Sequence, residues 1–306
     1  MLEISKSNLP ARLPRRERDC NKGDFGAVAV VGGGPGMVGA ALLAGRAALL
    51  CGTGRVYVGL MDDRVAVDPN TPELMLAKPG QAMDRAVEAC ASVPPAQMEF
   101  LAHQGAYGGS GQGPGSACLV VGPGLGQSGE ARQWLEQALS ASVPLVLDAD
   151  ALNLLARDKA LLHAMSVRDA ETLITPHPGE AGRLLGISTH EIQSNRFEAI
   201  QALSQRYYAS VVLKGHGSLV LGEDGIPWRN TTGNPGMAAP GMGDVLCGII
   251  AALVAQGFSL DHAAVVGVWL HGTAGDRALT ERQGPVGITA SEVALAAREI
   301  LNASLG

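Results

Sequence analysis

The chain has 306 residues, of which 46% are apolar, and its formal net charge is -6. A chain of this size can bury one large α/β core or two smaller ones, and no uninterrupted apolar run reaches the ~18 residues of a membrane-spanning helix. The one basic cluster in the sequence (Arg12, Arg15, Arg16 and Arg18) is short and lies near the start, whereas nucleic-acid-binding proteins usually carry a basic face. We therefore expect neither a membrane nor a nucleic acid as a partner.

The cysteines and the first residues indicate the cellular compartment. The five cysteines are scattered, odd in number and never arranged as CxxC, which favours reduced core thiols over disulfides or a zinc site. The sequence starts MLEISKSNLPARLPRRERD, which has no apolar signal core. We therefore predict a soluble cytoplasmic protein.

From residue 22 onward, short β-branched runs alternate with segments rich in Ala and Leu, after an irregular lead-in over residues 1–21. The expected strands cover residues 27–31, 55–60, 118–121, 144–148, 172–174, 210–214 and 218–222. The expected helices cover residues 39–51, 129–140, 151–156, 179–185, 191–207, 243–255, 260–280 and 290–303. This alternation predicts a mostly parallel sheet with helices on both faces, in a single α/β domain over residues 22–306.

Two connections have their own signals. Gly215, His216 and Gly217 alone separate the last two expected strands, which predicts a β-hairpin. Residues 103–117 are rich in Gly and Ser, and we expect a flexible loop there.

The first glycine-rich turn contains the pattern GxGxxG at Gly34, Gly36 and Gly39, between an expected strand and an expected helix. Asp62 lies about where the acid of a Rossmann dinucleotide site would lie, so an NAD-dependent oxidoreductase is one alternative. Two features argue against it. Pro35 removes a backbone donor within the pattern, and the chain has several further glycine-rich turns that such an enzyme does not need.

The strongest pattern is GMGD, which ends at Asp244 and opens an apolar helix. The free N–H groups and the macrodipole at a helix N-terminus bind anions, and the upstream glycines Gly233, Gly236 and Gly241 let the backbone approach a phosphate. An Asp at a helix start can serve as a cap only, but a cap does not require these glycines. We therefore interpret Asp244 as an acid aimed at an acceptor hydroxyl next to a bound phosphate.

These residues resemble the ribokinase superfamily and, more narrowly, its ADP/ATP-dependent NAD(P)H-hydrate dehydratases. The resemblance rests on six motifs in the family's order, from about Lys22 to the C-terminus: KGDFG with the first glycine-rich turn, GPGLG, VLDADALNLLA, TPHPGEAGRLLG, VLKGHGSLV and NPGMAAPGMGD. It implies a ribokinase-like three-layer α/β/α sandwich with a mostly parallel central sheet.

The resemblance also implies a site. Four residues would contact the hydrated nicotinamide cofactor: Ala40, Gly126, His177 and Asp244. Six would hold the adenine nucleotide: Lys214, Gly215, His216, Gly217, Ser218 and Gly243. Without the motifs, Ala40 would be an ordinary helix residue, His177 would be a turn residue, and residues 214–218 would be a hairpin turn. Gly124 lies near Gly126 and is the alternative for the same contact.

Three positions around the end of one expected strand and one at a helix start complete the predicted site. Glu180 matches an acid that organises Mg²⁺ through water, although at a helix start it would equally serve the macrodipole. We assign Asp148, Asp150 and Asn153 a supporting role, since open α/β sheets bind ligands at the carboxyl ends of their strands.

The implied activity is dehydration of the S form of NADHX or NADPHX at the expense of ADP or ATP, with Mg²⁺ as cofactor and Asp244 as catalytic residue, in a homotetramer. A vitamin or sugar kinase that shares GMGD is the main alternative. Many relatives carry an epimerase domain before these motifs, and because only residues 1–21 precede them here, we expect this chain not to epimerise the R form. The choice between ADP and ATP, and between NADHX and NADPHX, stays open at this point.

Overall fold

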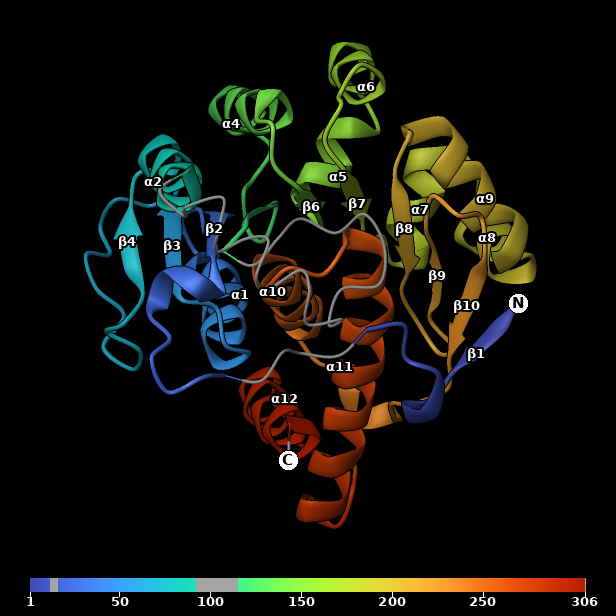
Figure 1. Ribbon diagram of the computed structural model, residues 1–306. Coiled ribbons are helices and arrows are strands. Elements are labelled where there is room, and N and C mark those ends of the chain that lie inside the picture. The colour runs from blue at the N-terminus through green and yellow to red at the C-terminus, as the bar shows by residue number, and fades with distance from the viewer. Residues whose placement is uncertain (12–15, 92–114, 306) are drawn as a thin grey trace.

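The computed structural model describes residues 1–11, 16–91 and 115–305, and its described part contains one large sheet (Figure 1). The strands are β1 (Leu2–Ile4), β2 (Ala27–Gly32), β3 (Arg55–Leu60), β4 (Met75–Ala77), β5 (Ala117–Val121), β6 (Leu145–Leu147), β7 (Thr172–Ile174), β8 (Ser210–Leu213), β9 (Leu219–Leu221) and β10 (Pro227–Asn230). Their order is β1-β10-β9-β8-β7-β6-β5-β2-β3-β4. All neighbours from β8 to β4 are parallel, whereas β9 runs antiparallel to both β8 and β10.

Helices cover both faces of the sheet. The helices of one layer are α1 (Val38–Leu50), α10 (Met242–Ala255), α11 (Leu260–Arg282) and α12 (Ala290–Leu305). Those of the other layer are α2 (Pro79–Ala91), α4 (Gly129–Ser140), α5 (Asp150–Leu155), α6 (Lys159–Ser166), α7 (Pro178–Leu185), α8 (Thr189–Ser194) and α9 (Arg196–Tyr207). Three short 3-10 helices are η1 (Lys6–Asn8), η2 (Lys22–Phe25) and η3 (Pro235–Met237).

Strand β2 shows why the chain needs two helical layers. Its side chains alternate between the faces, so that Val28 and Val30 enter the core below α1 and α10, while Ala29 and Val31 enter the core below the other layer. All four are completely buried. A strand that is apolar on both faces must be covered twice, as the continuous apolar run in the sequence predicted.

The predicted α/β alternation and the hairpin are confirmed, with β8 and β9 antiparallel around residues 214–218. The prediction of a single helix over residues 191–207 is wrong. The chain breaks at Asn195, whose φ of -143° is extended and whose side chain accepts a hydrogen bond from the Glu198 N–H, so that α8 ends and α9 begins there.

The lead-in expected to be irregular is partly a strand, because Leu2–Ile4 pairs in parallel with β10 and Ile4 is buried. The sequence patterns also did not predict β4, β10, α2 and α6. Most of the loop expected over residues 103–117 lies outside the described residues, and Ala117 already belongs to β5. Across residues 1–11, 16–91 and 115–305, no helix combines the length and apolarity needed to span a bilayer.

Helices α1 and α10 approach each other closely because Gly248 has no side chain. A Cβ at Gly248 would lie 2.1 Å from the Ala44 carbonyl oxygen and 2.9 Å from the Ala47 Cβ. This contact holds α10 in its place against α1, and therefore also fixes where α10 begins.

Gly248→Ala should therefore lower the free energy of unfolding by roughly 1–3 kcal/mol, because the added methyl group must push the two helices apart. Gly39→Ala is the matched control. A Cβ at Gly39, in the first turn of α1, meets nothing within 4 Å, so that this variant should be as stable as the parent or gain up to about 1 kcal/mol. Urea unfolding measures both, and equal stability of the two variants would contradict the packing argument.

Candidate active site

The carboxyl ends of the parallel strands and the start of α10 meet at one edge of the sheet. Asp148 follows β6, His177 lies three residues after β7, and Lys214 follows β8. Gly243, in the first turn of α10, lies directly over two of them, since a Cβ there would be 3.2 Å from both Asp148 Oδ2 and Lys214 Nζ. Four segments far apart in the sequence thus meet at this edge.

Lys214 is the one cation at the centre of this edge among the described residues. Its Nζ donates a hydrogen bond to Asp148 Oδ1 at 2.5 Å and lies 3.7 Å from Glu180 Oε2. Both carboxylates are buried, with relative exposures of 2% for Asp148 and 5% for Glu180. Burial alone would lower the pKa of Lys214, but the charges of the two acids outweigh it and raise that pKa, so that the ammonium group stays protonated.

Asp244 is the half-buried third acid of this cluster, in the first turn of α10. The N-cap of α10 is Gly241, with φ of 85°, so that Asp244 is not the capping residue. Within the described chain its carboxylate forms no hydrogen bond or ion pair. The pKa of Asp244 is raised to about 7, mainly by burial and also by the nearby negative charge of Asp148, whereas the positive charge of Lys214 opposes the shift. Asp244 can therefore gain or lose a proton near neutral pH.

His177 and Glu180 form a capping box at the start of α7. His177 Nδ1 accepts a hydrogen bond from the Gly179 N–H at 3.0 Å, and the His177 N–H donates to Glu180 Oε2 at 2.8 Å. The His177 ring is half exposed, whereas Glu180 is buried against Lys214. Glu180 thus orients the loop that carries His177, the helix-start role that the sequence left open.

The two glycines of the GPGLG turn have different surroundings. A Cβ at Gly124 would lie 2.6 Å from the Met37 carbonyl oxygen and 3.3 Å from the Ala40 Cβ, so that Gly124 packs against the first glycine-rich turn. A Cβ at Gly126 would meet nothing within 4 Å. Of the two, Gly126 is the one with open space beside its Cα.

Asp150 and Asn153 support the neighbouring loops. Asp150 Oδ2 accepts a hydrogen bond from the Gly126 N–H at 2.9 Å, and Asn153 Oδ1 accepts one from Arg183 Nε at 2.7 Å. Between Asp148 and Asp150, Ala149 has φ of 50°, in the left-handed region that is costly for a residue with a Cβ. The turn thereby sends the two acids to different partners, Lys214 and the Gly126 loop.

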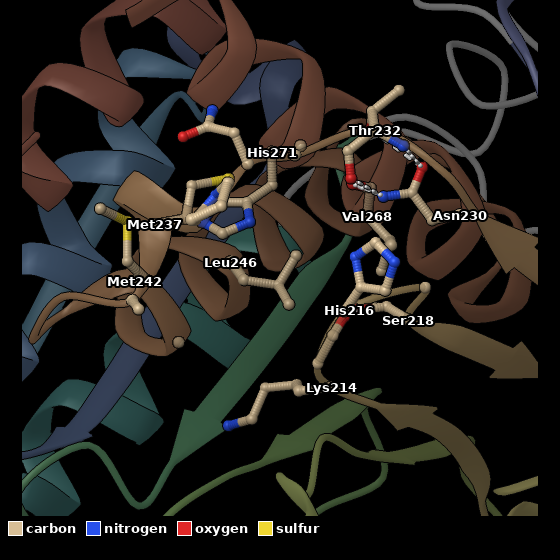
Figure 2. A pocket seen from close by; sticks show the side chains of 18 residues that line it. Lys214, His216, Ser218, Asn230, Thr232, Met237, Met242, Leu246, Val268 and His271 are labelled. Atoms are coloured by element: carbon tan, nitrogen blue, oxygen red, sulfur yellow. Dashed lines mark hydrogen bonds between the residues drawn. The ribbon is translucent and has the colours of Figure 1, made fainter. Parts of the chain in front are cut away.

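A cavity of about 580 Å³ begins at Lys214 and Gly243 and extends between the β8–β9 hairpin and helices α10 and α11. In Figure 2, His216 and Ser218 lie on one side of it and Met237, Met242 and His271 on the other. All six residues predicted to hold the nucleotide line this cavity: Lys214, Gly215, His216, Gly217, Ser218 and Gly243. The structure therefore brings them together around one space.

Sequence reasoning missed several lining residues, among them Asn230, Thr232, Met237 and His271. Asn230 and Thr232 belong to a segment read only for its glycines, and their side chains bond to each other at 2.9 Å. His271 had no local signal, because it lies inside α11. Burial lowers the pKa of His271 to about 4, although the Met242 backbone opposes the shift, so that the ring is neutral.

The dinucleotide-binding alternative fails on Asp62. Its carboxylate lies 2.6 Å from Arg64 in an ion pair and is buried, so that it is not free for a ribose. The first glycine-rich turn instead packs against the second, where the Gly34 N–H donates to the Gly124 carbonyl at 2.6 Å.

The chain is similar to known proteins over nearly its whole length. The sequence model of the family described as NAD(P)H-hydrate dehydratase matches residues 28–296. The chain belongs to the NAD(P)H-hydrate dehydratase family. Over 300 residues it is 39% identical to the ADP-dependent (S)-NAD(P)H-hydrate dehydratase of Neisseria meningitidis, covering 96% of this chain and 91% of that one.

Other members of the family are longer. Over 292 residues the chain is 40% identical to the bifunctional NAD(P)H-hydrate repair enzyme of Coxiella burnetii, covering 95% of this chain but 53% of that one. The chain thus spans about half the length of the bifunctional relatives that it matches.

Solved structures confirm the fold. The ADP/ATP-dependent NAD(P)H-hydrate dehydratase of Bacillus subtilis, co-crystallised with ATP and Mg²⁺, superposes with a TM-score of 0.78 at 26% identity, covering 99% of this chain and 98% of that one. A ribokinase-like superfamily protein of Enterococcus faecalis also has a TM-score of 0.78, at 23% identity. The expected ribokinase-like architecture is therefore correct.

The raised pKa of Asp244 means that its charge costs stability at neutral pH. The folded-state pKa, about 7, lies above the ordinary value of 3.8, so that the cost is absent below pH 4 and complete above pH 7. Asp244→Asn should therefore raise the free energy of unfolding near pH 8, by at most about 4 kcal/mol, and leave it unchanged near pH 4. Urea unfolding at the two pH values measures this, and an equal effect at both would contradict it.

Proposed function

We propose that this chain dehydrates the S form of NADHX or NADPHX, with ADP (or ATP) as phosphoryl donor. One observation carries the proposal. The six residues predicted to bind the nucleotide line one cavity, and Gly243, which lines it beside Lys214, directly precedes Asp244, whose carboxylate forms no hydrogen bond within the described chain. A donor phosphate placed there would lie between a cation, a helix N-terminus and a base. The ADP-dependent dehydratases among the relatives support this choice.

The chemistry follows from the poor leaving ability of hydroxide. Asp244 would accept the proton of the substrate hydroxyl while the hydroxyl oxygen attacks the terminal phosphorus of the nucleotide. The bond between that phosphorus and the bridging oxygen of the nucleotide then breaks. The ring nitrogen lone pair then expels phosphate to give an iminium ion, and loss of a proton from the adjacent ring carbon restores the double bond and leaves NAD(P)H. The products are NAD(P)H, phosphate and AMP, or ADP if ATP is the donor.

The start of α10 and Lys214 would stabilise the phosphoryl group during transfer. The first N–H groups of a helix lack partners within it, and the macrodipole places positive charge at this end. Lys214, which lines the cavity, adds an ammonium group whose charge Asp148 partly offsets. We assign Ala40, Gly126 and His177 to the hydrated cofactor, with His177 presented by the capping box of α7.

The residues present fit a magnesium ion held mainly through water. Within the described chain, no three His, Cys, Asp or Glu side chains are grouped to hold a metal directly. Mg²⁺ keeps several waters and uses few protein carboxylates, so that Glu180 beside Lys214 suffices as an indirect ligand next to the nucleotide phosphates. The ion would supply charge neutralisation on the transferring phosphoryl group.

We further propose a cytoplasmic homotetramer. The compartment rests on the cysteine pattern, and all five cysteines are free thiols in the structure. The tetramer rests on the family resemblance, and light scattering after size-exclusion chromatography measures it.

Asp244→Asn should lower turnover by several orders of magnitude while ADP binding is retained, because the variant keeps the shape of the site but cannot accept a proton. The assay follows recovery of the reduced-nicotinamide absorbance from NADHX with ADP and Mg²⁺, and calorimetry measures ADP binding. Asp84→Asn, an exposed acid on α2, is the matched control and should behave like the parent. Near-parental turnover of Asp244→Asn would remove Asp244 from the chemistry. A vitamin or sugar kinase would consume nucleotide without restoring the reduced-nicotinamide absorbance.

The pH profile should show the titration of Asp244. Because the base must be ionised, kcat/KM should fall below a midpoint near pH 7 and be about tenfold lower at one pH unit below that midpoint. Asp148→Asn should move the midpoint to lower pH, since it removes a negative charge that raises the pKa of Asp244. A flat profile from pH 5.5 to 8.5, or an unmoved midpoint in Asp148→Asn, would contradict the assignment.

A further inference from the structure

A second cavity, of about 600 Å³, lies on the layer of the sheet formed by α5 and α7. Its lining residues are Gln127, Asn153, Ala156, Arg157 and Arg183. None of them lines the first cavity, which lies against α10 and α11. The sequence motifs left this second space without a role, apart from the supporting position of Asn153.

Both arginines of this cavity lack a counter-charge. In the described part of the chain, neither Arg157 nor Arg183 forms an ion pair. Five other arginines of the described chain each form an ion pair with a carboxylate: Arg46, Arg64, Arg132, Arg277 and Arg282. On a protein with a net charge of -6, two unneutralised guanidinium groups in one hollow mark a local attraction for anions.

Hydrogen bonds hold both guanidinium groups in place and leave donors free. Arg157 donates to the Gln127 carbonyl at 3.2 Å, and Arg183 donates through Nε to Asn153 Oδ1 at 2.7 Å. Each bond uses one N–H group of a fork that carries five, and the Asn153 amide nitrogen adds a further donor. Asp150, which neighbours Gln127 through a hydrogen bond, also accepts from the Gly126 N–H. The lining thus offers many donors and few acceptors.

The second cavity adjoins the positions assigned to the hydrated cofactor. Gln127 directly follows Gly126 in the chain. Arg183 lies on α7 six residues after His177, which is about 9 Å along a helix. A dinucleotide with its hydrated ring between Asp244 and His177 can therefore extend past Gly126 toward the two arginines.

We propose that Arg157 and Arg183 bind a phosphate of the dinucleotide substrate, remote from the hydrated ring; this inference rests on the proposed function. Guanidinium forks match the oxygens of phosphate and form charge-assisted hydrogen bonds with them. The phosphate is either part of the pyrophosphate that NADHX and NADPHX share or the 2′-phosphate that NADPHX alone carries. The arginines would select and position the substrate without taking part in bond breaking.

The test compares Arg157→Ala, Arg183→Ala and the double variant on NADHX and NADPHX at saturating ADP. The double variant should raise KM at least about tenfold with kcat nearly unchanged, since the lost contacts serve binding alone. An equal rise for both substrates assigns the arginines to the pyrophosphate, and a rise for NADPHX alone assigns them to the 2′-phosphate. Arg183→Lys should recover part of the loss, because it restores the charge but not the fork.

Arg298→Ala is the matched control, as it removes one exposed positive charge from α12 in the other layer. If KM of the double variant stays within twofold of this control for both substrates, the inference is wrong. Direct titration of NADH and NADPH needs no turnover and separates the two proposals. A chain without dehydratase activity overturns the proposed function, while loss of NADH or NADPH binding in the double variant still supports the arginine site.

Discussion

The ion pair between the half-buried ammonium group of Lys214 and the buried carboxylate of Asp148 is the interaction on which the arrangement of the site depends. Asp148 and Glu180 could not both be buried and charged at this edge without a cation between them, because each lone carboxylate would pay a large desolvation cost. With Lys214 bonded to Asp148, the third acid, Asp244, is left without a partner and with a pKa near neutrality. One ion pair thus creates both the fixed charges and the titratable base.

Backbone packing places this cluster beside the helix N-terminus. Gly248 lets α10 cross α1 closely, and Gly243 lets the first turn of α10 approach Asp148 and Lys214, where any side chain would meet both charged groups. The glycines of the chain therefore serve two different purposes. Some allow two helices to touch, and others allow the backbone to reach the site.

The two cavities have no lining residue in common. The first, against α10 and α11, offers a hairpin, a helix N-terminus and one lysine, which suits a nucleotide that presents its phosphates inward. The second, beside α5 and α7, is lined by two arginines. This division matches a reaction between two phosphate-bearing molecules whose reacting ends must meet at Asp244.

The sequence by itself determined the alternation of strands and helices and the hairpin around residues 214–218, because hydrophobic periodicity and glycine-rich turns are local signals. It also predicted site roles for Asp244 and the KGHGS segment, the second of these through the family resemblance. It did not predict the break at Asn195 or the pairing of Leu2–Ile4 with β10, since a cap and a distant strand partner outweighed the local pattern. Only the tertiary structure decided that Lys214 pairs with Asp148, that His271 lines the first cavity, and that Arg157 and Arg183 share a second one. The physical reason is that burial and charge pairing depend on which chain segments meet, and these segments are far apart in the sequence.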